Sequence, residues 1–290
     1  MTIKNIYFHT LSPLHVGAGR GTGLIDLPIV RERATNLPIL PGSSVKGVIR
    51  ESIERLGKKD NSLNAKLKDF FGMADNEAKA AAVSFSDAYV LCLPVRAFKG
   101  TFAWVTCPQI LARYKRDLQN FNAKVPVVGG ENAAVYSDKK IWNESKVILE
   151  DLDLNAMVDS NVDAFAKLIA SIFFKDEAWK RMFLDRFVVI SDEVFDFIAK
   201  HATEVRARIR IDDETRIVAK GALWYEESLP AETLLTGIVW QDDALAKGED
   251  FLNILEEKIP KREMQFGGKA TTGLGRMLVT MEGSDACKNS

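Results

Sequence analysis

Apolar and polar residues alternate in several short stretches of this 290-residue chain, and alternation with a period of two predicts strands. The clearest case is a hairpin formed by residues 205–211 and 216–223, where Arg206, Arg208 and Arg210 alternate with apolar residues. A short acidic turn joins its two strands. Further strands are predicted at 3–10, 27–33, 83–85, 88–94, 100–105, 146–149, 187–190, 234–239 and 277–281.

Other stretches repeat apolar residues every three or four positions, which predicts helices. The best example begins at a cap on Ser43 or Ser44 and ends at Gly57. Residues 122–145 are expected to be irregular, and the tail at 283–290 to be disordered. Interleaved helices and mostly antiparallel strands favour the α+β class. Further helices are predicted at 64–71, 108–120, 163–174, 177–185 and 252–258, together with one that Ser191 caps and that ends near His201.

The composition is that of an ordinary globular protein, with 47% hydrophobic and 27% charged residues. A chain of this length forms one large domain or two small ones. No apolar stretch is long enough to span a bilayer, and the N-terminus does not resemble a signal peptide. Cys92, Cys107 and Cys287 lie far apart, without the spacing of a zinc site. We therefore expect a cytoplasmic protein that does not enter a membrane.

The net charge of −1 argues against a strongly cationic nucleic-acid binder, but the charges are unevenly distributed. Residues 1–50 carry six lysines and arginines against two acidic residues, and residues 261–277 carry four against one. Acidic residues gather elsewhere, for example at 150–153. A basic face on a nearly neutral protein fits a subunit that binds RNA with one side and protein with others.

Two glycine-rich segments, 17–23 and 265–276, contain arginine or lysine. Neither matches a nucleotide-binding motif, because the first leads back into a strand and Lys269 of the second precedes alanine. A turn explains any one of these glycines by itself. The helix that begins near Ser43 carries Lys46 and Arg50 on its first turns. Together with this helix start, the two segments suggest a surface that holds a phosphate backbone. One carboxylate, Asp26, and one histidine, His15, lie beside this surface in the sequence and suggest that the bound chain is cleaved there.

The candidate phosphate-binding residues come from these two segments and from the start of the predicted helix. A helix start offers free N–H groups, to which lysine adds charge. The alternative is an ordinary cap followed by a solvated helix face. The candidates are Gly17, Gly19, Arg20, Ser43, Ser44, Lys46, Arg50, Gly267, Gly268, Lys269, Thr271 and Arg276.

Several segments together resemble one known family. The string His9-Thr-Leu-Ser-Pro-Leu-His15 leads into the first glycine segment, and Asp26-Leu-Pro-Ile-Val-Arg-Glu-Arg33 follows it. Later come 37–47, 85–88, 208–227 and the second glycine segment. With these residues the chain resembles the RAMP superfamily of CRISPR proteins, and more narrowly the backbone subunit of the type III-B (Cmr) RNA-guided effector complex. The string at 26–33 is the most specific, and residues 108–185 contribute little.

The resemblance implies a single domain over 1–290, with a modified RRM-like, ferredoxin-like palm and helical insertions. It implies a β-hairpin thumb at about 205–223 and a glycine-rich loop at 265–276. Copies of such a subunit stack along a guide CRISPR RNA, together with other Cmr-complex subunits. Each thumb displaces a nucleotide of the guide–target duplex, and single-stranded target RNA is cut beside it.

The family also implies the activity of an endoribonuclease. Cleavage requires a loop aspartate, which Asp26 matches, and a divalent metal ion, Mg²⁺ or Mn²⁺, for which Asp26 is the candidate ligand. The alternative is a non-catalytic scaffold subunit that only binds guide RNA. A metabolic phosphate-binding enzyme is the weakest alternative, because the nucleotide motifs fail.

Four residues are candidates for the chemistry: Asp26, His15, Tyr225 and Glu227. RNA carries its own nucleophile, the 2′-hydroxyl, so the protein needs to hold geometry, stabilise charge and handle protons. Asp26 is either a turn residue or a carboxylate that binds a metal water or transfers a proton. His15 is structural, or it contacts RNA and helps protonation. Tyr225, Glu226 and Glu227 form a solvated acidic strand end, or Tyr225 and one of the two glutamates approach the cleavage site of the same or a neighbouring subunit.

Overall fold

Strand β1 (Thr2–Thr10) is buried continuously from Asn5 to its end, which is typical of the centre of a sheet. β12 (Leu234–Gln241) and β14 (Arg276–Glu282) pair with it on either side, both antiparallel. β13 (Arg262–Gln265) pairs with β14. On the other side, β12 pairs with β3 (Val83–Phe85) and β4 (Ala88–Ala97). These strands form the palm.

The computed structural model describes residues 1–21, 23–73, 79–118, 121–135, 145–212, 214–259 and 262–282. The tail at 283–290, for which disorder is expected, lies outside these residues. Part of the segment expected to be irregular, 136–144, lies outside them as well. Within the part that is described, no helix is long and apolar enough to cross a membrane.

The order of the palm strands identifies its topology. Helix α1 (Gly42–Gly57) lies between β1 and β3 in the chain, and α8 (Phe251–Lys258) lies between β12 and β14. The strands run in the order β14–β1–β12–β4 across the sheet. A βαββαβ unit with this order is ferredoxin-like. The prediction of an α+β fold with a ferredoxin-like palm is therefore confirmed.

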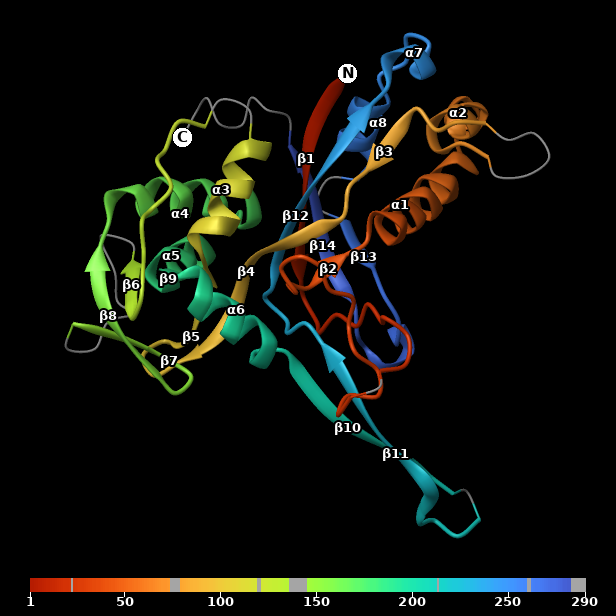
Figure 1. The fold of residues 1–290 in the computed structure, drawn as a ribbon. Coiled ribbons are helices and arrows are strands. Elements are labelled where there is room, and N and C mark those ends of the chain that lie inside the picture. Colours follow the sequence, from red (N-terminus) through yellow and green to blue (C-terminus); the bar gives the residue numbers. More distant parts are fainter. Residues whose placement is uncertain are drawn as a thin grey trace.

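A second group of strands continues the same sheet beyond β4. The order is β5 (Thr101–Thr106), β9 (Phe187–Ile190), β6 (Asn132–Val135), β8 (Leu152–Val158) and β7 (Lys146–Leu149). Figure 1 shows helices gathered around these strands. They are α3 (Pro108–Asp117), α4 (Ser160–Phe173), α5 (Glu177–Arg186) and α6 (Asp192–His201).

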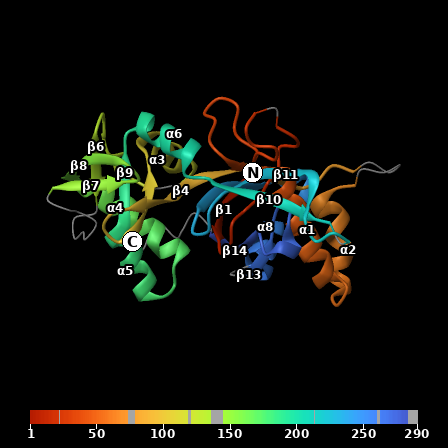
Figure 2. The same ribbon diagram turned by 90° about the horizontal axis from the view of Figure 1, so that it is seen from below.

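The remaining elements are small. Helix α2 (Asn61–Phe71) packs against α1 and ends at Gly72, as predicted, and α7 (Asp243–Ala246) lies close to α2. β2 (Ile39–Leu40) pairs with β4, and a 3₁₀ turn, η1 (Ala270–Thr272), lies in the second glycine segment. Figure 2 shows α1 and α2 at the end of the molecule opposite to β6–β8.

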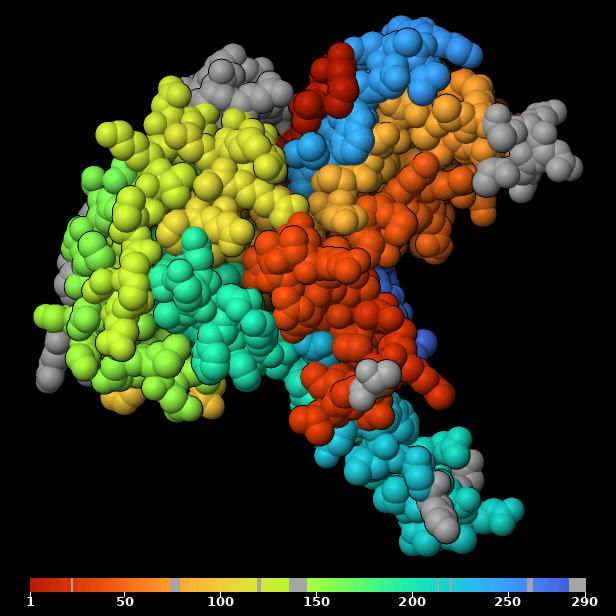
Figure 3. Space-filling model, in the orientation of Figure 1, coloured from red at the N-terminus to blue at the C-terminus, as the bar shows by residue number. Residues whose placement is uncertain are grey.

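The predicted hairpin is confirmed and stands apart from the large sheet. β10 (Glu204–Ile211) and β11 (Val218–Ser228) form a separate two-stranded antiparallel sheet, which we call the thumb. It projects away from the body of the molecule (Figures 1 and 3). Its apolar side chains Ile209, Ile211 and Leu223 are more than half exposed. An exposed apolar hairpin of this kind is typical of a surface that meets a partner.

Three predictions about local structure are wrong. Residues 27–33 form no strand, because only isolated bridges at Leu27, Ile29 and Arg31 tie them to other segments. The segment predicted to be irregular contains β6, which pairs in parallel with β8. Neither Ser43 nor Ser44 caps α1.

Helix α1 begins at Gly42, ahead of the cap predicted at Ser43 or Ser44. The N-cap position is Pro41, which has no side chain that can accept a hydrogen bond. The cap comes from elsewhere in the chain, since Asp87 Oδ1 accepts the Gly42 N–H at 2.7 Å. A Cβ atom at position 42 would lie 2.4 Å from the Phe85 carbonyl oxygen, so only glycine fits at this close approach.

Candidate active site

Asp26 lies on an exposed loop that is hydrogen-bonded to the base of the thumb. Its carboxylate oxygen Oδ2 accepts the backbone N–H of Tyr225 on β11 at 2.8 Å. The neighbouring Leu27 N–H donates to the Tyr225 carbonyl, and the Leu27 carbonyl accepts the Glu227 N–H. The second carboxylate oxygen, Oδ1, has no hydrogen-bond partner among the residues that the structure describes. The loop therefore fixes the position of Asp26 and leaves one of its oxygens available.

The first glycine segment forms the other half of this loop. The Ala18 N–H donates to the Pro28 carbonyl and the Val30 N–H to the Val16 carbonyl, so the two halves run antiparallel. The Gly21 N–H closes the loop by donating to the Asp26 carbonyl at 2.8 Å. Three predicted residues of the segment, Gly17, Gly19 and Arg20, are exposed near Asp26 in this loop.

His15 is buried between the two glycine-rich segments. Its Nδ1–H donates to the Glu227 carbonyl at 2.6 Å, because a carbonyl oxygen only accepts. A Cβ at Gly17 would lie 3.0 Å from Nε2 of the His15 ring, and one at Gly267 would lie 2.4 Å from the His15 carbonyl oxygen. Gly267 also has φ +70°, a conformation that favours glycine. These glycines therefore let both segments close around His15.

Glu227 is buried and fully engaged. Its Oε2 accepts the Ile29 N–H at 3.0 Å, and its Oε1 pairs with the Arg31 guanidinium at 2.5 Å. The carboxylate thus holds the segment after Asp26 against β11. Glu227 is therefore not part of a solvated strand end, and its position favours a role in placing the loop. Its contact with the cleavage site stays a prediction.

Glu226 is not a solvated strand end either, because its carboxylate is buried and accepts three side-chain donors. Its carboxylate accepts hydrogen bonds from Lys269 Nζ at 2.8 Å, Trp224 Nε1 at 2.7 Å and Arg208 Nε at 3.2 Å. Burial by itself would raise the pKa of Glu226, but these three donors outweigh it and lower the pKa to about 2. Glu226 therefore stays ionised and ties the thumb to the second glycine segment.

The alternating arginines of β10 are the sequence signal for this contact. They face the same side of the hairpin as Glu226, which lies opposite Arg206 in the register of β10 and β11. Arg208 binds Glu226, and Arg206 pairs with Glu204. Tyr225 is on the opposite side of β11 and is 41% exposed, and its backbone N–H binds Asp26.

The predicted phosphate-binding residues fall into two groups. On α1, Lys46 is half-buried and has no ion-pair partner among the described residues, whereas Arg50 pairs with Glu54 on the helix surface. In the second glycine segment, Lys269 pairs with Glu226, and Arg276 pairs with Glu263. Ser43, Gly268 and Thr271 are exposed, and Ser44 is half-buried.

The side chains around Asp26 limit how a metal ion can be bound there. The described residues contain no cluster of three histidine, cysteine or acidic side chains. Glu226 and Glu227 are both committed to other donors. Mg²⁺ is commonly bound through one or two carboxylates, with waters and substrate phosphates completing the shell. One open oxygen of Asp26 fits that pattern only when RNA supplies further oxygens.

Comparison with known proteins gives one consistent family. A model of the RAMP superfamily matches residues 7–278. The chain is 36% identical over 285 residues to "CRISPR system Cmr endoribonuclease Cmr4" of Pyrococcus furiosus, which covers 94% of each chain. It is 22% identical to "CRISPR system CMR subunit Cmr4" of Saccharolobus solfataricus, again over 94% of each.

Solved structures agree with this result. The crystal structure of oligomeric Cmr4 from Pyrococcus furiosus superposes with a TM-score of 0.76 and 28% identity, and the match covers 98% of this chain and 99% of that one. A chain of the type III-B Cmr-beta complex bound to cognate target RNA superposes with a TM-score of 0.73 over 97% of each chain. At 20% identity, the second match shows the fold alone.

Proposed function

The chain belongs to the RAMP superfamily, and from this premise we propose that it is the backbone subunit of a type III-B CRISPR effector filament. In this proposal it binds a guide RNA, stacks with further copies of itself and with other subunits, and cuts complementary target RNA. A relative 36% identical over nearly the whole chain is named an endoribonuclease. A solved relative is described as oligomeric. We also propose that residues 1–290 form one domain with insertions.

One observation carries the catalytic part of the proposal. Asp26 is held at the base of the thumb by the Tyr225 N–H, and its other oxygen has no partner among the described residues. A scaffold that only binds RNA does not need a carboxylate in that position. A fixed, exposed acid beside a projecting hairpin suits a site where the thumb lifts one nucleotide out of the duplex.

The chemistry follows from RNA itself. When a nucleotide leaves the stack, its 2′-oxygen can lie in line with the adjacent phosphorus. A bond forms between that oxygen and phosphorus, and the bond from phosphorus to the next 5′-oxygen breaks. The 2′-hydroxyl gives up its proton, and the departing 5′-oxygen takes one from water. The products are a 2′,3′-cyclic phosphate and a 5′-hydroxyl.

The protein residues divide this work. Asp26 Oδ1 accepts the 2′-hydroxyl proton directly or through a water molecule. His15 and Glu227 hold the loop and the thumb base in place. We propose that Asp26 also ligates a divalent cation, Mg²⁺ or Mn²⁺, which supplies charge stabilisation at the phosphate when bound.

The experiment is target cleavage by the chain co-purified with a guide RNA. Cut positions are mapped on several unrelated targets, with and without Mg²⁺ or Mn²⁺. The proposal expects cuts at a constant spacing set by the subunit repeat, whatever the target sequence. A thumb shortened at its tip should lose that spacing more than it loses target affinity. Target binding without any cleavage would favour the scaffold alternative, and cuts that follow sequence would exclude a register set by the thumb.

A further inference from the structure

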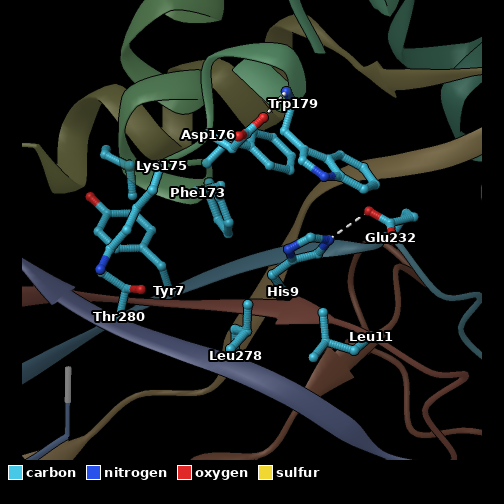
Figure 4. Close-up of a pocket in the computed structure, with 12 residues that line it drawn as sticks. Tyr7, His9, Leu11, Phe173, Lys175, Asp176, Trp179, Glu232, Leu278 and Thr280 are labelled. Carbon is cyan, nitrogen blue, oxygen red and sulfur yellow. Dashed lines mark hydrogen bonds and ion pairs between the residues drawn. The ribbon is translucent and has the colours of Figure 1, made fainter. Parts of the chain in front are cut away.

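A pocket of about 380 Å³ lies away from Asp26, between the palm sheet and the turn that joins α4 to α5 (Figure 4). Its floor comes from β1 and β14, and its roof includes Phe174 and Trp179. On this face of β1, the Tyr7 ring contacts Tyr114 of α3 and Phe173 of α4, so helices cover the neighbouring part of the sheet. The volume lies in the range of small-molecule sites, and such pockets are common between packed layers.

The walls of the pocket are aromatic. The rings of Phe174 and Trp179 are nearly parallel, at 6°, with their centroids 5.9 Å apart. The His9 ring meets Phe174 edge to face at 5.4 Å. Trp179 is nevertheless 41% exposed at the mouth of the pocket. A tryptophan that packs against the Phe174 ring and is partly exposed offers a flat surface on which a planar ligand can stack.

One polar side chain inside the pocket, His9, is hydrogen-bonded to a carboxylate. His9 is only 7% exposed, and its Nε2 is bonded to Glu232 Oε2 at 2.7 Å. Because the carboxylate accepts, the Nε2 carries a proton, and in the neutral form of the ring Nδ1 is then the acceptor. Nδ1 has no hydrogen-bond partner among the residues that the structure covers. The Glu232 carbonyl is itself held by Trp104 Nε1 at 2.9 Å, so the pair is fixed from both ends.

Lys175 brings a positive charge to the pocket, which the carboxylates of Asp176 and Glu232 also line. Lys175 has no ion-pair partner within the described ranges. The adjacent Asp176 carboxylate caps α5 by accepting the N–H groups of Ala178 and Trp179, and it makes no ion pair with Lys175. The pocket thus combines an aromatic platform, a buried acceptor and an exposed cation. A ligand that matches all three has a planar ring with an N–H donor and carries an anionic group.

We propose that this pocket binds one unpaired nucleotide. The base stacks on Trp179, an N–H of the base donates to His9 Nδ1, and the phosphate meets Lys175. Aromatic side chains of RRM-like folds hold bases by stacking; here the platform, Trp179, lies on α5 above the sheet. The same chemistry has two sources, a free mononucleotide or a nucleotide of single-stranded RNA. Neither requires cleavage at Asp26, so the proposal stands apart from the proposed function.

The test is isothermal titration of the full chain with AMP, with ribose 5-phosphate and with the trinucleotide ApApA. AMP or ApApA should bind saturably at one site per chain, and ribose 5-phosphate should bind at least tenfold more weakly, since it has no base. Trp179→Ala should weaken binding about tenfold, as expected for the loss of one stacking platform. Lys175→Gln and His9→Gln should each weaken it severalfold. Phe197→Ala and Lys167→Gln, which change exposed residues outside the pocket, serve as matched controls.

The arms of the experiment separate the outcomes. Tighter binding of AMP than of ApApA identifies a free nucleotide, and the reverse order identifies a nucleotide of a strand. Asp26→Asn should bind the probes as the wild type does, whether or not that variant cleaves RNA. Equal binding of ribose 5-phosphate and AMP would overturn the proposal. So would an affinity unchanged in Trp179→Ala, or no saturable binding of AMP and ApApA to chain whose fold is verified by circular dichroism.

Discussion

Two regions at the base of the thumb carry acidic residues, and they differ in the exposure of those acids and in the number of hydrogen bonds that the acids accept. The loop region presents Asp26, which is exposed and accepts a single backbone N–H. The strand region presents Glu226 and Glu227, which are 5% and 3% exposed and accept donors on both carboxylate oxygens. An acid that does chemistry needs an oxygen that its own protein leaves unused. By that criterion only Asp26 qualifies among the three.

The difference follows from the cost of burying charge. A carboxylate removed from water is stable only when cations or N–H groups replace the lost hydration. Glu226 meets that requirement with Lys269, Trp224 and Arg208, and Glu227 meets it with Arg31 and the Ile29 N–H. Those partners are then no longer available to RNA. Asp26 remains in water, so it needs no such partners and keeps its reactivity for a ligand.

The largest expected effect comes from removing the charge of the exposed acid. Asp26→Asn keeps an oxygen that accepts the Tyr225 N–H but loses the proton acceptor. We expect the rate of target cleavage to fall by about 10²-fold or more, with assembly and target affinity nearly unchanged. Single-turnover cleavage and filter binding, measured on the same preparation, test this. Asp153→Asn, on β8, is the control, and cleavage at the wild-type rate in a filament made only of Asp26→Asn would refute the catalytic role.

The second effect concerns the buried acid that holds the loop. Glu227→Ala leaves the Arg31 guanidinium, which is 17% exposed, without its carboxylate, and it also removes the acceptor for the Ile29 N–H. We expect the free energy of unfolding to fall by about 3 kcal/mol, since removing one partner of a buried pair strands the other. Urea unfolding measures the loss, and Glu193→Ala on the surface of α6 is the matched control.

Glu227→Ala also separates a structural from a chemical role of Glu227. If Glu227 holds the loop in place, the cleavage activity per folded molecule of Glu227→Ala should exceed that of Asp26→Asn at low temperature. If stability is unchanged while cleavage falls as far as in Asp26→Asn, Glu227 belongs to the chemistry together with Asp26.

Much of the fold follows from local patterns in the sequence. Ser191 caps α6 as predicted, because its hydroxyl accepts the Val194 N–H. The same reasoning fails for Ser43 and Ser44, because Asp87, 45 residues further on, caps the helix instead. Residues 27–33 begin with a short apolar run that is predicted to be a strand, but the Ile29 N–H bonds to the Glu227 carboxylate and not to a neighbouring strand. In both cases a distant side chain replaces the local partner that the pattern assumes.

The candidate site likewise combines features that are visible in the local sequence with contacts between residues far apart in the chain. Asp26 and the glycine segments are recognisable from the chain itself, because an exposed acid between glycines is a local feature. The role of Glu226 is not, since its three donors come from β10, β11 and the second glycine segment. The pairing register of the hairpin, read together with the alternating arginines, is the signal that points to it.

The third prediction uses the pH dependence of Glu226. Its pKa in the folded chain, about 2, lies below the ordinary value of 4.5. The stabilisation is therefore complete above about pH 4.5 and is lost as the pH falls towards 2. Wild type should be more stable than Glu226→Gln by about 3 kcal/mol at pH 7, and the difference should shrink below pH 4.5. Urea unfolding of both proteins at pH 7, 5 and 3 tests this, and a difference independent of pH would contradict it.

The smallest effect compares an available lysine with a committed one. Lys46 has no ion-pair partner among the described residues, whereas Lys269 is bonded to Glu226. Lys46→Gln should make the salt dependence of guide-RNA binding shallower by about 0.7 in slope, equally for all guide sequences, and should not change stability. Lys269→Gln should lower the free energy of unfolding and change the slope less. Guide binding at several salt concentrations, with urea unfolding alongside, distinguishes them. A different result would contradict this comparison: Lys269→Gln changes the slope as much as Lys46→Gln and leaves the free energy of unfolding unaltered. Lys269 would then exchange Glu226 for a phosphate when RNA binds, and the difference between partnered and unpartnered groups would hold for the acids but not for the lysines.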